Sequence, residues 1–567
     1  MAMTPAAHSA RRADQQLEIK SRAVRIALVG GAIAVAFTAV SLQLVRLAMK
    51  GQHENLLVAA AAPVSSTYSR PDIVDRNGRL LASDVPLPSL YADPKRVPSV
   101  DETLEQLSSV LPGIATPELR RLLSDKARRF IWIKRRMSTA LAERIHALGL
   151  PGLAFRNELA RSYPQGRFAG HLLGHVNGQN RGVIGLERYI DEQGGVRLVP
   201  TARVNTSPPV RLTIDAAAQF AVEEELRAAM ARYQTVAATG VVMDARTGEV
   251  RAAASVPGVD PDEPTELLDK ARMNRLAGDV YELGSVFKVF TIAMALETGL
   301  VGPSTIVDVT QPLKVGRFTI RDFHPARRPL TVTEVFTKSS NVGAGRLALE
   351  IGQERQQAML KALGVLTPMA TEAGVIVHPK LPQPWGKAAT ITVAYGHGLA
   401  VAPLQFAASA AALVNGGIVV KPTLITRPDA LAYAASGARV LKPSTSAAIR
   451  EMMRLNVTSS GGSGRRADVP GYEVGGKTGT ADWAQSGRYN GKSVINSFLA
   501  AFPIREPRYV VLVTLFDPKS TTASSRKPHR TAGLNAAPTA GQIIARVAPL
   551  LGVRPVNRGV RARFGQK

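Results

Sequence analysis

The chain has 567 residues, enough for two or three folded domains with sizeable cores. Its hydrophobic fraction of 45% excludes a wholly disordered protein, and the absence of cysteine excludes disulfides, thiolate metal sites and a cysteine nucleophile. The formal net charge of +27 comes with no zinc-finger, ribonucleoprotein or basic-zipper pattern, so we expect no nucleic-acid partner. Solvated surface, an anionic membrane or an acidic wall polymer would accommodate this charge.

The first predicted element is a membrane-spanning helix. Residues 26–45 form an uncharged stretch of 20, long enough to cross a hydrocarbon core of about 30 Å. The basic bias before it places the amino terminus in the cytoplasm and the body of the chain outside. A cleavable signal peptide is the alternative, but the stretch exceeds the usual signal core of roughly 7–15 residues. We predict a basic cytoplasmic tail over 1–25 and a retained anchor over 26–49.

Residues 50–205 are predicted to form a non-catalytic domain. A turn at Asp75–Gly78 lies between short apolar runs, and apolar spacings of three and four predict short helices within 101–150. Gly-rich loops follow across 164–185. The paired prolines of 205–210 stop regular structure, so this segment is the best linker candidate.

The next domain, placed over 206–550, mixes helices and strands. An early hairpin, a central group of helices and two late Val/Leu-rich strands indicate an α/β (α+β) fold with a central antiparallel sheet. The remaining residues, 551–567, form a basic tail. The predicted elements are a strand at 210–215, a helix at 216–233, a hairpin at 239–256 with its turn at Ala245–Gly248, a helix from Ser285 to Gly299, a strand around 475–482, and strands at 494–504 and 508–516.

A Ser-x-x-Lys motif opens the predicted helix that ends at Gly299. Ser285 and Lys288 share one helix face in an almost wholly apolar run. This motif alone is weak evidence, because Lys288 could simply extend out of an apolar helix toward water. A second copy, Ser524–Lys527, lies in a polar loop that a following proline disfavours as helix.

Two more motifs change the interpretation of the first. Ser339 and Asn341 form a Ser-x-Asn, and residues 477–479 are the only Lys-Thr-Gly in the chain. In the order Ser-x-x-Lys, Ser-x-Asn, Lys-Thr-Gly, the three motifs are the signature of penicillin-binding proteins and active-site serine β-lactamases.

The residue types in these motifs make a coherent acyl-transfer site. A serine hydroxyl needs an adjacent base, and Lys288 can serve if its amine is neutral. Burial and the nearby like charge of Lys477 would both lower the pKa of Lys288. We expect Ser339 to relay a proton to the leaving amine and Asn341 to orient Lys288 and the substrate amide.

The remaining groups are assigned to binding and charge stabilisation. The backbone N–H groups of Ser285 and Thr480 are the expected oxyanion hole. Lys477 and Thr478 offer a cation and a hydroxyl that suit a terminal carboxylate, and the strand segment Thr478, Gly479, Thr480 is the expected substrate-binding edge.

With these motifs, the chain resembles a class B penicillin-binding protein of the division type (FtsI-like) over about residues 65–545. That family has a serine transpeptidase/β-lactamase-like domain, preceded by an elongated pedestal of the penicillin-binding-protein dimerisation type and one transmembrane helix. The stretches that resemble family segments are 75–95, 161–187, 210–215, 244–250, 273–288, 330–343, 395–405 and 468–482.

The resemblance implies a peptidoglycan D,D-transpeptidase of septal wall synthesis that needs no metal or organic cofactor. Ser285 would be acylated by the D-Ala-D-Ala end of a stem peptide, and an amine of a neighbouring stem peptide would resolve the acyl-enzyme. β-Lactams would acylate the same serine. The implied partners are an FtsW-type glycan polymerase and other divisome proteins. The implied location is the inner membrane, single-pass, with the catalytic body in the periplasm at the septum.

The sequence departs from the family pattern at Pro71, Leu283 and Val286, and in the segment 197–210. None of these changes removes a proposed catalytic group. The alternatives are an elongation-type relative, a D,D-carboxypeptidase or β-lactamase-like hydrolase and, last, a non-catalytic scaffold or sensor. A bifunctional enzyme is less favoured, because the region before residue 206 shows no convincing glutamate-centred glycosyltransferase motif.

Overall fold

The structure is a computed structural model, and its described residues form two compact units. The described part of the first unit is 31, 37–43, 66–67, 86–158 and 200, and that of the second lies within 68–85, 159–199 and 207–556. Among the described residues, no helix combines the length and the apolar character needed to cross a membrane. The predicted tail over 1–25, most of the predicted anchor and residues 557–567 of the predicted basic tail lie outside the described residues. The described residues are 31, 37–43, 66–200, 207–316, 318–485, 488–519 and 531–556.

The first unit contains the short helices that the sequence predicts between 101 and 150. Ser99, Thr116 and Ser138 each accept a backbone N–H at a helix start, which satisfies one unpaired donor of that helix. The sequence analysis missed β4, because its four residues stand in a basic stretch that shows no alternation. The elements are the end of β3 (Leu80–Ala92), η1 (Pro94–Arg96), α2 (Val100–Val110), α3 (Pro117–Ser124), β4 (Ile131–Lys134), α4 (Thr139–His146) and the start of β5 (Leu153–Ser162).

In the second unit, the residues before the catalytic domain surround a buried ionic network. The fully buried Arg70 places its Nε 2.7 Å from Glu187 Oε2, and Arg161 Nε lies 2.7 Å from Glu187 Oε1. Each charge thereby has a partner, as burial requires. The family departure at Pro71 leaves Arg70 in this network. Short elements here are β1 (Ser66–Ser69), β2 (Ile73–Val74), α5 (Gly170–Leu173), β6 (His175–Val176), β7 (Gly182–Ile184), α6 (Gly185–Glu192) and β8 (Arg197–Pro200).

The predicted turn at Asp75–Gly78 is confirmed, and it joins this region to the catalytic domain. Asp75 Oδ1 accepts the backbone N–H groups of Asn77 and Arg79, and Asp75 Oδ2 accepts the N–H of Ala216 at the start of α7 (Ala216–Tyr233). The strand predicted at 210–215 is shorter than expected: β9 holds only Val210–Arg211. After Arg211, Leu212 forms only an isolated bridge with Ile425, and Asp215 then caps α7.

The catalytic domain is built on a five-stranded antiparallel sheet with the order β11-β10-β20-β19-β18. The predicted hairpin is confirmed as β10 (Ala237–Asp244) and β11 (Val250–Val256), and the two late strands as β19 (Arg488–Phe502) and β20 (Tyr509–Phe516). β18 (Gly475–Gln485) carries the Lys-Thr-Gly motif at one edge.

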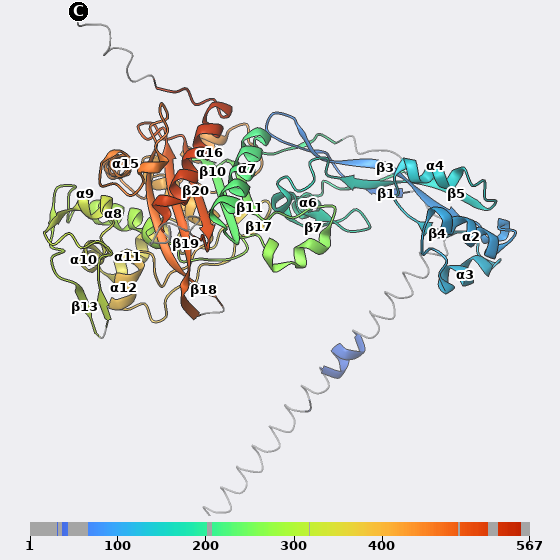
Figure 1. Ribbon diagram of the computed structural model, residues 1–567, viewed down its shortest axis with the longest axis horizontal. Coiled ribbons are helices and arrows are strands. Elements are labelled where there is room, and N and C mark those ends of the chain that lie inside the picture. Colours follow the sequence, from blue (N-terminus) through green and yellow to red (C-terminus); the bar gives the residue numbers. More distant parts are fainter. Residues whose placement is uncertain are drawn as a thin grey trace, which may run out of the picture. The chain divides into compact units, whose positions relative to one another are not determined.

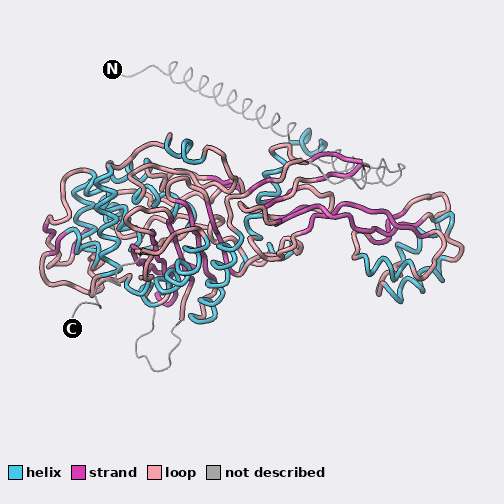
Figure 2. The backbone as a smooth tube through the Cα atoms, turned by 90° about the horizontal axis from the view of Figure 1, so that it is seen from above, coloured by secondary structure: helices cyan, strands magenta, loops and turns pink. Residues whose placement is uncertain are grey.

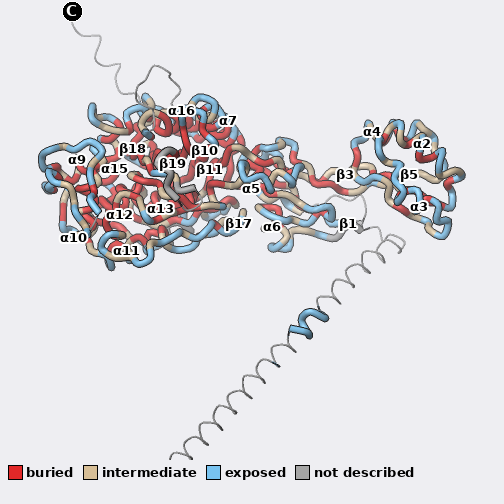
Figure 3. The backbone as a smooth tube through the Cα atoms, turned by 60° about the horizontal axis from the view of Figure 1, so that its bottom comes forward, coloured by how far each residue is buried: buried red, intermediate tan, exposed pale blue. Residues whose placement is uncertain are grey.

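Helices cover both faces of this sheet (Figures 1 and 2). One core lies between the sheet and α7 with α16 (Ala536–Leu550), and the other between the sheet and α8 (Lys288–Glu297) with α13 (Pro403–Val414). The strands are therefore buried on both sides, as the red course of the central strands shows in Figure 3. The Lys-Thr-Gly motif lies in a strand of this sheet, and the Ser-x-x-Lys motif lies at the start of α8, which packs against it.

The other elements of the domain are short or lie outside the sheet. They are η2 (Pro264–Leu268), η3 (Lys270–Arg272), η4 (Gly284–Phe287), β12 (Ile306–Val307), β13 (Leu313–Val315), β14 (Phe318–Ile320), β15 (Leu330–Thr331), α9 (Val332–Thr337), α10 (Asn341–Ile351), α11 (Gln353–Ala362), β16 (Ala370–Thr371), β17 (Gly374–Val375), α12 (Lys387–Val393), α14 (Ala430–Ala435), α15 (Pro443–Thr458), η5 (Arg465–Ala467) and η6 (Ala532–Leu534).

Candidate active site

Ser285 lies in a tight turn immediately before a buried helix. The sequence predicts one continuous helix from Ser285, whereas the structure has the 3₁₀ turn η4 followed by α8, which begins at Lys288. Lys288 is fully buried, and its Nζ lies 2.8 Å from Ser285 Oγ. The tighter turn therefore still places the amine beside the hydroxyl.

The Ser-x-Asn motif supplies the other contacts of the Lys288 amine. Its Nζ lies 2.7 Å from Asn341 Oδ1, 2.7 Å from the Ser339 carbonyl oxygen and 3.1 Å from Ser339 Oγ. Ser339 joins α9 to α10 with φ at +59°, a conformation that turns the chain sharply between the two helices. The two motifs thus meet around one nitrogen atom.

Lys477 approaches the same hydroxyl group from the edge strand β18. This side chain is fully buried, and its Nζ donates to Ser339 Oγ at 2.9 Å. Ser339 Oγ is consequently within hydrogen-bond distance of both lysine nitrogens. A proton can pass along this chain of groups with little movement of heavy atoms.

Burial sets the charge of both lysines. Removal from water lowers the pKa of Lys288 well below its usual range, and the nearby Lys477 lowers it further, while the Asp322 carboxylate opposes the change. Burial also lowers the pKa of Lys477, to about 7. At neutral pH the site can therefore hold a neutral amine at Lys288, as a base requires.

Two glycines let β18 lie directly against the turn that carries Ser285. A Cβ added at Gly479 would stand 2.4 Å from the Leu283 carbonyl oxygen, and one at Gly284 would stand 2.4 Å from the Thr480 carbonyl oxygen. Gly284 also has a φ of +62°, which disfavours other residues. The Thr480 backbone is therefore held next to Ser285, where an oxyanion hole would need its N–H.

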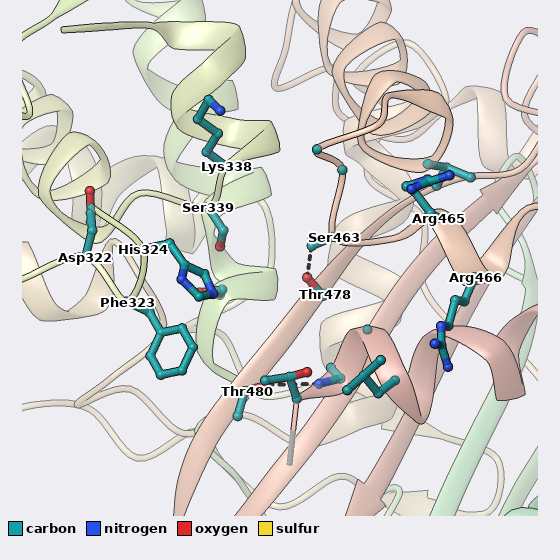
Figure 4. Close-up of a pocket in the computed structure, with 18 of the residues that line it drawn as sticks. Asp322, Phe323, His324, Lys338, Ser339, Ser463, Arg465, Arg466, Thr478 and Thr480 are labelled. Carbon is teal, nitrogen blue, oxygen red and sulfur yellow. Dashed lines mark hydrogen bonds between the residues drawn. The ribbon is translucent and has the colours of Figure 1, made fainter. Parts of the chain in front are cut away.

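These groups open onto a cleft of about 1160 Å³. The side chains of Ser285, Ser339 and Asn341 line it together with Thr478 and Thr480, whereas Lys288 and Lys477 are buried behind them. Figure 4 shows Ser339 and His324 on one wall and Thr478 and Thr480 on the facing wall. The structure thus brings every predicted site residue to one place.

Two models of known families match the chain. The penicillin-binding protein transpeptidase domain matches residues 238–544, and the penicillin-binding protein dimerisation domain matches residues 66–193. The chain is a class B penicillin-binding protein.

Named relatives and solved structures agree with this membership. The chain is 37% identical to the probable peptidoglycan D,D-transpeptidase FtsI of Caulobacter vibrioides over 86% of this chain and 82% of that protein. It is 31% identical to the peptidoglycan D,D-transpeptidase FtsI of Escherichia coli over 86% and 84%. The transpeptidase domain of Burkholderia pseudomallei penicillin-binding protein 3 is 29% identical with a TM-score of 0.54, over 61% of this chain and 98% of that one. Penicillin-binding protein 3 of Mycobacterium tuberculosis, at 24% identity, shares the fold with a TM-score of 0.64, over 87% and 98%.

Two residues that support the site of this penicillin-binding protein were missed by the sequence analysis. Asp322 accepts the Ser340 hydroxyl at 2.7 Å and the Val342 N–H at 2.9 Å, so its carboxylate caps α10 and fixes the Ser-x-Asn segment. The Ser463 and Thr478 hydroxyl oxygens are 2.6 Å apart. Neither residue lies within a recognisable motif, and only the fold brings them to the cleft.

Proposed function

We propose that this penicillin-binding protein is a serine-type peptidoglycan D,D-transpeptidase that joins stem peptides through an acyl-enzyme on Ser285. The contact that carries the proposal is the 2.8 Å approach of the fully buried Lys288 Nζ to Ser285 Oγ. A buried, neutral amine beside a hydroxyl is a base beside a nucleophile. Membership of a family whose relatives are named peptidoglycan D,D-transpeptidases supports the same substrate.

Acylation begins when Ser285 Oγ attacks the carbonyl carbon between the two D-alanines of the donor. The Ser285 proton passes to Lys288, and the backbone N–H groups of Ser285 and Thr480 stabilise the oxyanion. When the carbon–nitrogen bond breaks, the departing D-alanine amine takes a proton through Ser339, whose hydroxyl contacts both lysines. The donor is then an ester of Ser285.

Cross-linking is the reverse sequence with a different amine. The acceptor amine attacks the ester carbonyl and gives a proton through Ser339 toward Lys288, and Ser285 Oγ leaves as the protonated hydroxyl. In both steps Asn341 orients Lys288 and the substrate amide. Lys477, Thr478 and the Gly479 edge hold the terminal carboxylate of the donor during acylation, until that D-alanine departs.

The proposed cellular role is septal wall synthesis from the outer side of the inner membrane. We divide the chain into a cytoplasmic tail (1–25), an anchor (26–49), a pedestal (50–205), a transpeptidase domain (206–550) and a basic tail (551–567). An uncharged stretch of 20 residues supports the anchor, and relatives named FtsI support division over elongation. An FtsW-type glycan polymerase and other divisome proteins are the proposed partners.

The products decide between transfer and hydrolysis. The full-length enzyme, given glycan strands with pentapeptide stems, should release D-alanine and form cross-linked peptide dimers, which mass spectrometry of the digested product detects. A Ser285→Ala enzyme should form neither. Free tetrapeptide without dimers would identify a D,D-carboxypeptidase and refute the transpeptidase proposal.

Mid-cell localisation of a fluorescent fusion should accompany the activity, and side-wall localisation would favour the elongation role.

The pH dependence of the acylation rate should differ from that expected for a lysine with an ordinary pKa. Below the lowered pKa of Lys288 the amine is protonated and cannot accept the Ser285 proton, so kcat/KM should fall toward acid. Above about pH 7, Lys477 loses the positive charge that holds the carboxylate, so kcat/KM should fall toward alkali as well. Stopped-flow acylation by benzylpenicillin between about pH 5 and 10 measures this profile. A rate that keeps rising to about pH 10 would contradict it.

A further inference from the structure

Among the charged side chains that line the active-site cleft, two carboxylates have hydrogen-bond partners, whereas the cations have no carboxylate partner in the part of the chain that the structure describes. Of its carboxylates, Asp322 caps α10, and Asp468 accepts a hydrogen bond from Arg454 at 2.7 Å. None of the three lining cations forms an ion pair with any described residue. They are Lys338, Arg465 and Arg466.

The two arginines lie at one end of the cleft. Arg465 and Arg466 begin η5, two and three residues after Ser463, whose hydroxyl is 2.6 Å from that of Thr478. Both side chains are exposed, and Figure 4 shows them on the wall that carries Ser463 and Thr478. Arg465 has one long contact, 3.4 Å from the Ser460 carbonyl oxygen. Their guanidinium groups are therefore available to a ligand.

A negative charge lies farther along β18. Asp482 is exposed and lines the cleft four residues along β18 from Thr478, a separation of about 13 Å at 3.3 Å per residue. The field along the cleft is thus positive at the Thr478 end and negative at the Asp482 end. An anionic peptide end will be drawn toward the arginines and repelled from the aspartate.

We propose that Arg465 and Arg466 form an outer anion-binding subsite that captures the terminal carboxylate of the donor peptide before it reaches Thr478. This rests on the proposed function, because a D-Ala-D-Ala donor ends in a carboxylate. Exposed charges act mainly on encounter, so the pair raises the rate of productive binding and orients the donor. It does not act on the bonds that form and break.

The test removes the two charges and compares salt dependence. The full-length double variant R465A/R466A should acylate with benzylpenicillin, which carries a carboxylate, about tenfold more slowly than wild type in second-order rate constant at low salt. Raising the salt from roughly 0.02 M to roughly 0.5 M shortens the screening length severalfold. The wild-type rate should fall on that change, and the variant rate should fall distinctly less. The limiting acylation rate at saturating drug should be the same in the wild type and in the double variant.

Two further variants separate charge from structure. R465K/R466K keeps both charges and should retain most of the rate and its salt dependence. R355A/K361A removes two positive charges from α11, which does not line the cleft, and this variant should behave as wild type. Wild-type rate and salt slope in R465A/R466A, or an equal loss in the lysine pair, would overturn the proposal. Failure of the wild-type enzyme itself to acylate would instead refute the proposed function.

Discussion

The Ser285→Ala enzyme should take no covalent label from fluorescent penicillin, and its acylation rate should fall by at least about 10⁴-fold. The label requires an ester bond to Ser285 Oγ, which lies 2.8 Å from Lys288 Nζ in the Ser-x-x-Lys turn. The other hydroxyl near this amine, Ser339 Oγ, lies outside that turn. The variant should still fold, because the Lys288 amine keeps its contacts with Ser339 and Asn341. Gel fluorescence against thermal unfolding of the same sample measures both quantities.

A matched control comes from the second Ser-x-x-Lys in the sequence. Ser524→Ala alters that copy and should label like wild type. Equal labelling of Ser285→Ala and wild type would show that the nucleophile is another residue. Loss of labelling together with a large drop in the unfolding midpoint would mean that the variant had unfolded. Peptide mapping of the acylated wild-type enzyme by mass spectrometry, which should find the drug on the peptide that contains Ser285, would then replace it as the test.

The sequence predicted the parts of the fold whose signals are local. The β10–β11 hairpin follows from two apolar runs around Gly248, which has a φ of +77°, and α7 follows from a helical run directly after Asp215. Both signals lie within about 20 residues of the elements they specify. The order of the strands in the sheet could not be read in the same way, because β10 pairs with β20 from the far end of the chain.

The active site, too, has residues that local sequence signals predict and residues that only the fold reveals. Its three motifs are local and their residue types state their chemistry, so Ser285, Lys288 and Lys477 could be chosen from the sequence alone. Asp322 could not, because an aspartate after a short strand has no distinguishing pattern until α10 folds onto it. The 3₁₀ turn at Ser285 also escaped prediction, since it depends on the contact of Gly284 with the Thr480 backbone in β18.

Replacing Lys288 by methionine should slow acylation by roughly 10²–10⁴-fold while leaving the protein folded. The new side chain fills similar space but cannot accept the Ser285 proton. Asn341 Oδ1 and the Ser339 carbonyl oxygen each lose a hydrogen-bond partner, so the free energy of unfolding should fall by about 1–3 kcal/mol. Stopped-flow acylation and chemical denaturation measure the two effects separately.

The pH dependence of the Lys288→Met variant identifies what was lost. If Lys288 is the base, the residual rate of the variant should lose the decline toward acid that wild type shows, because the Lys288 amine whose protonation causes that decline is absent. Lys361→Met, an exposed lysine on α11, should keep both the wild-type rate and its profile. A Lys288→Met rate within tenfold of wild type would mean that Lys288 only supports the turn. Ser285 would then have to lose its proton to another group of the site, and Lys477, which shares the Ser339 hydroxyl with Lys288, would be the next candidate.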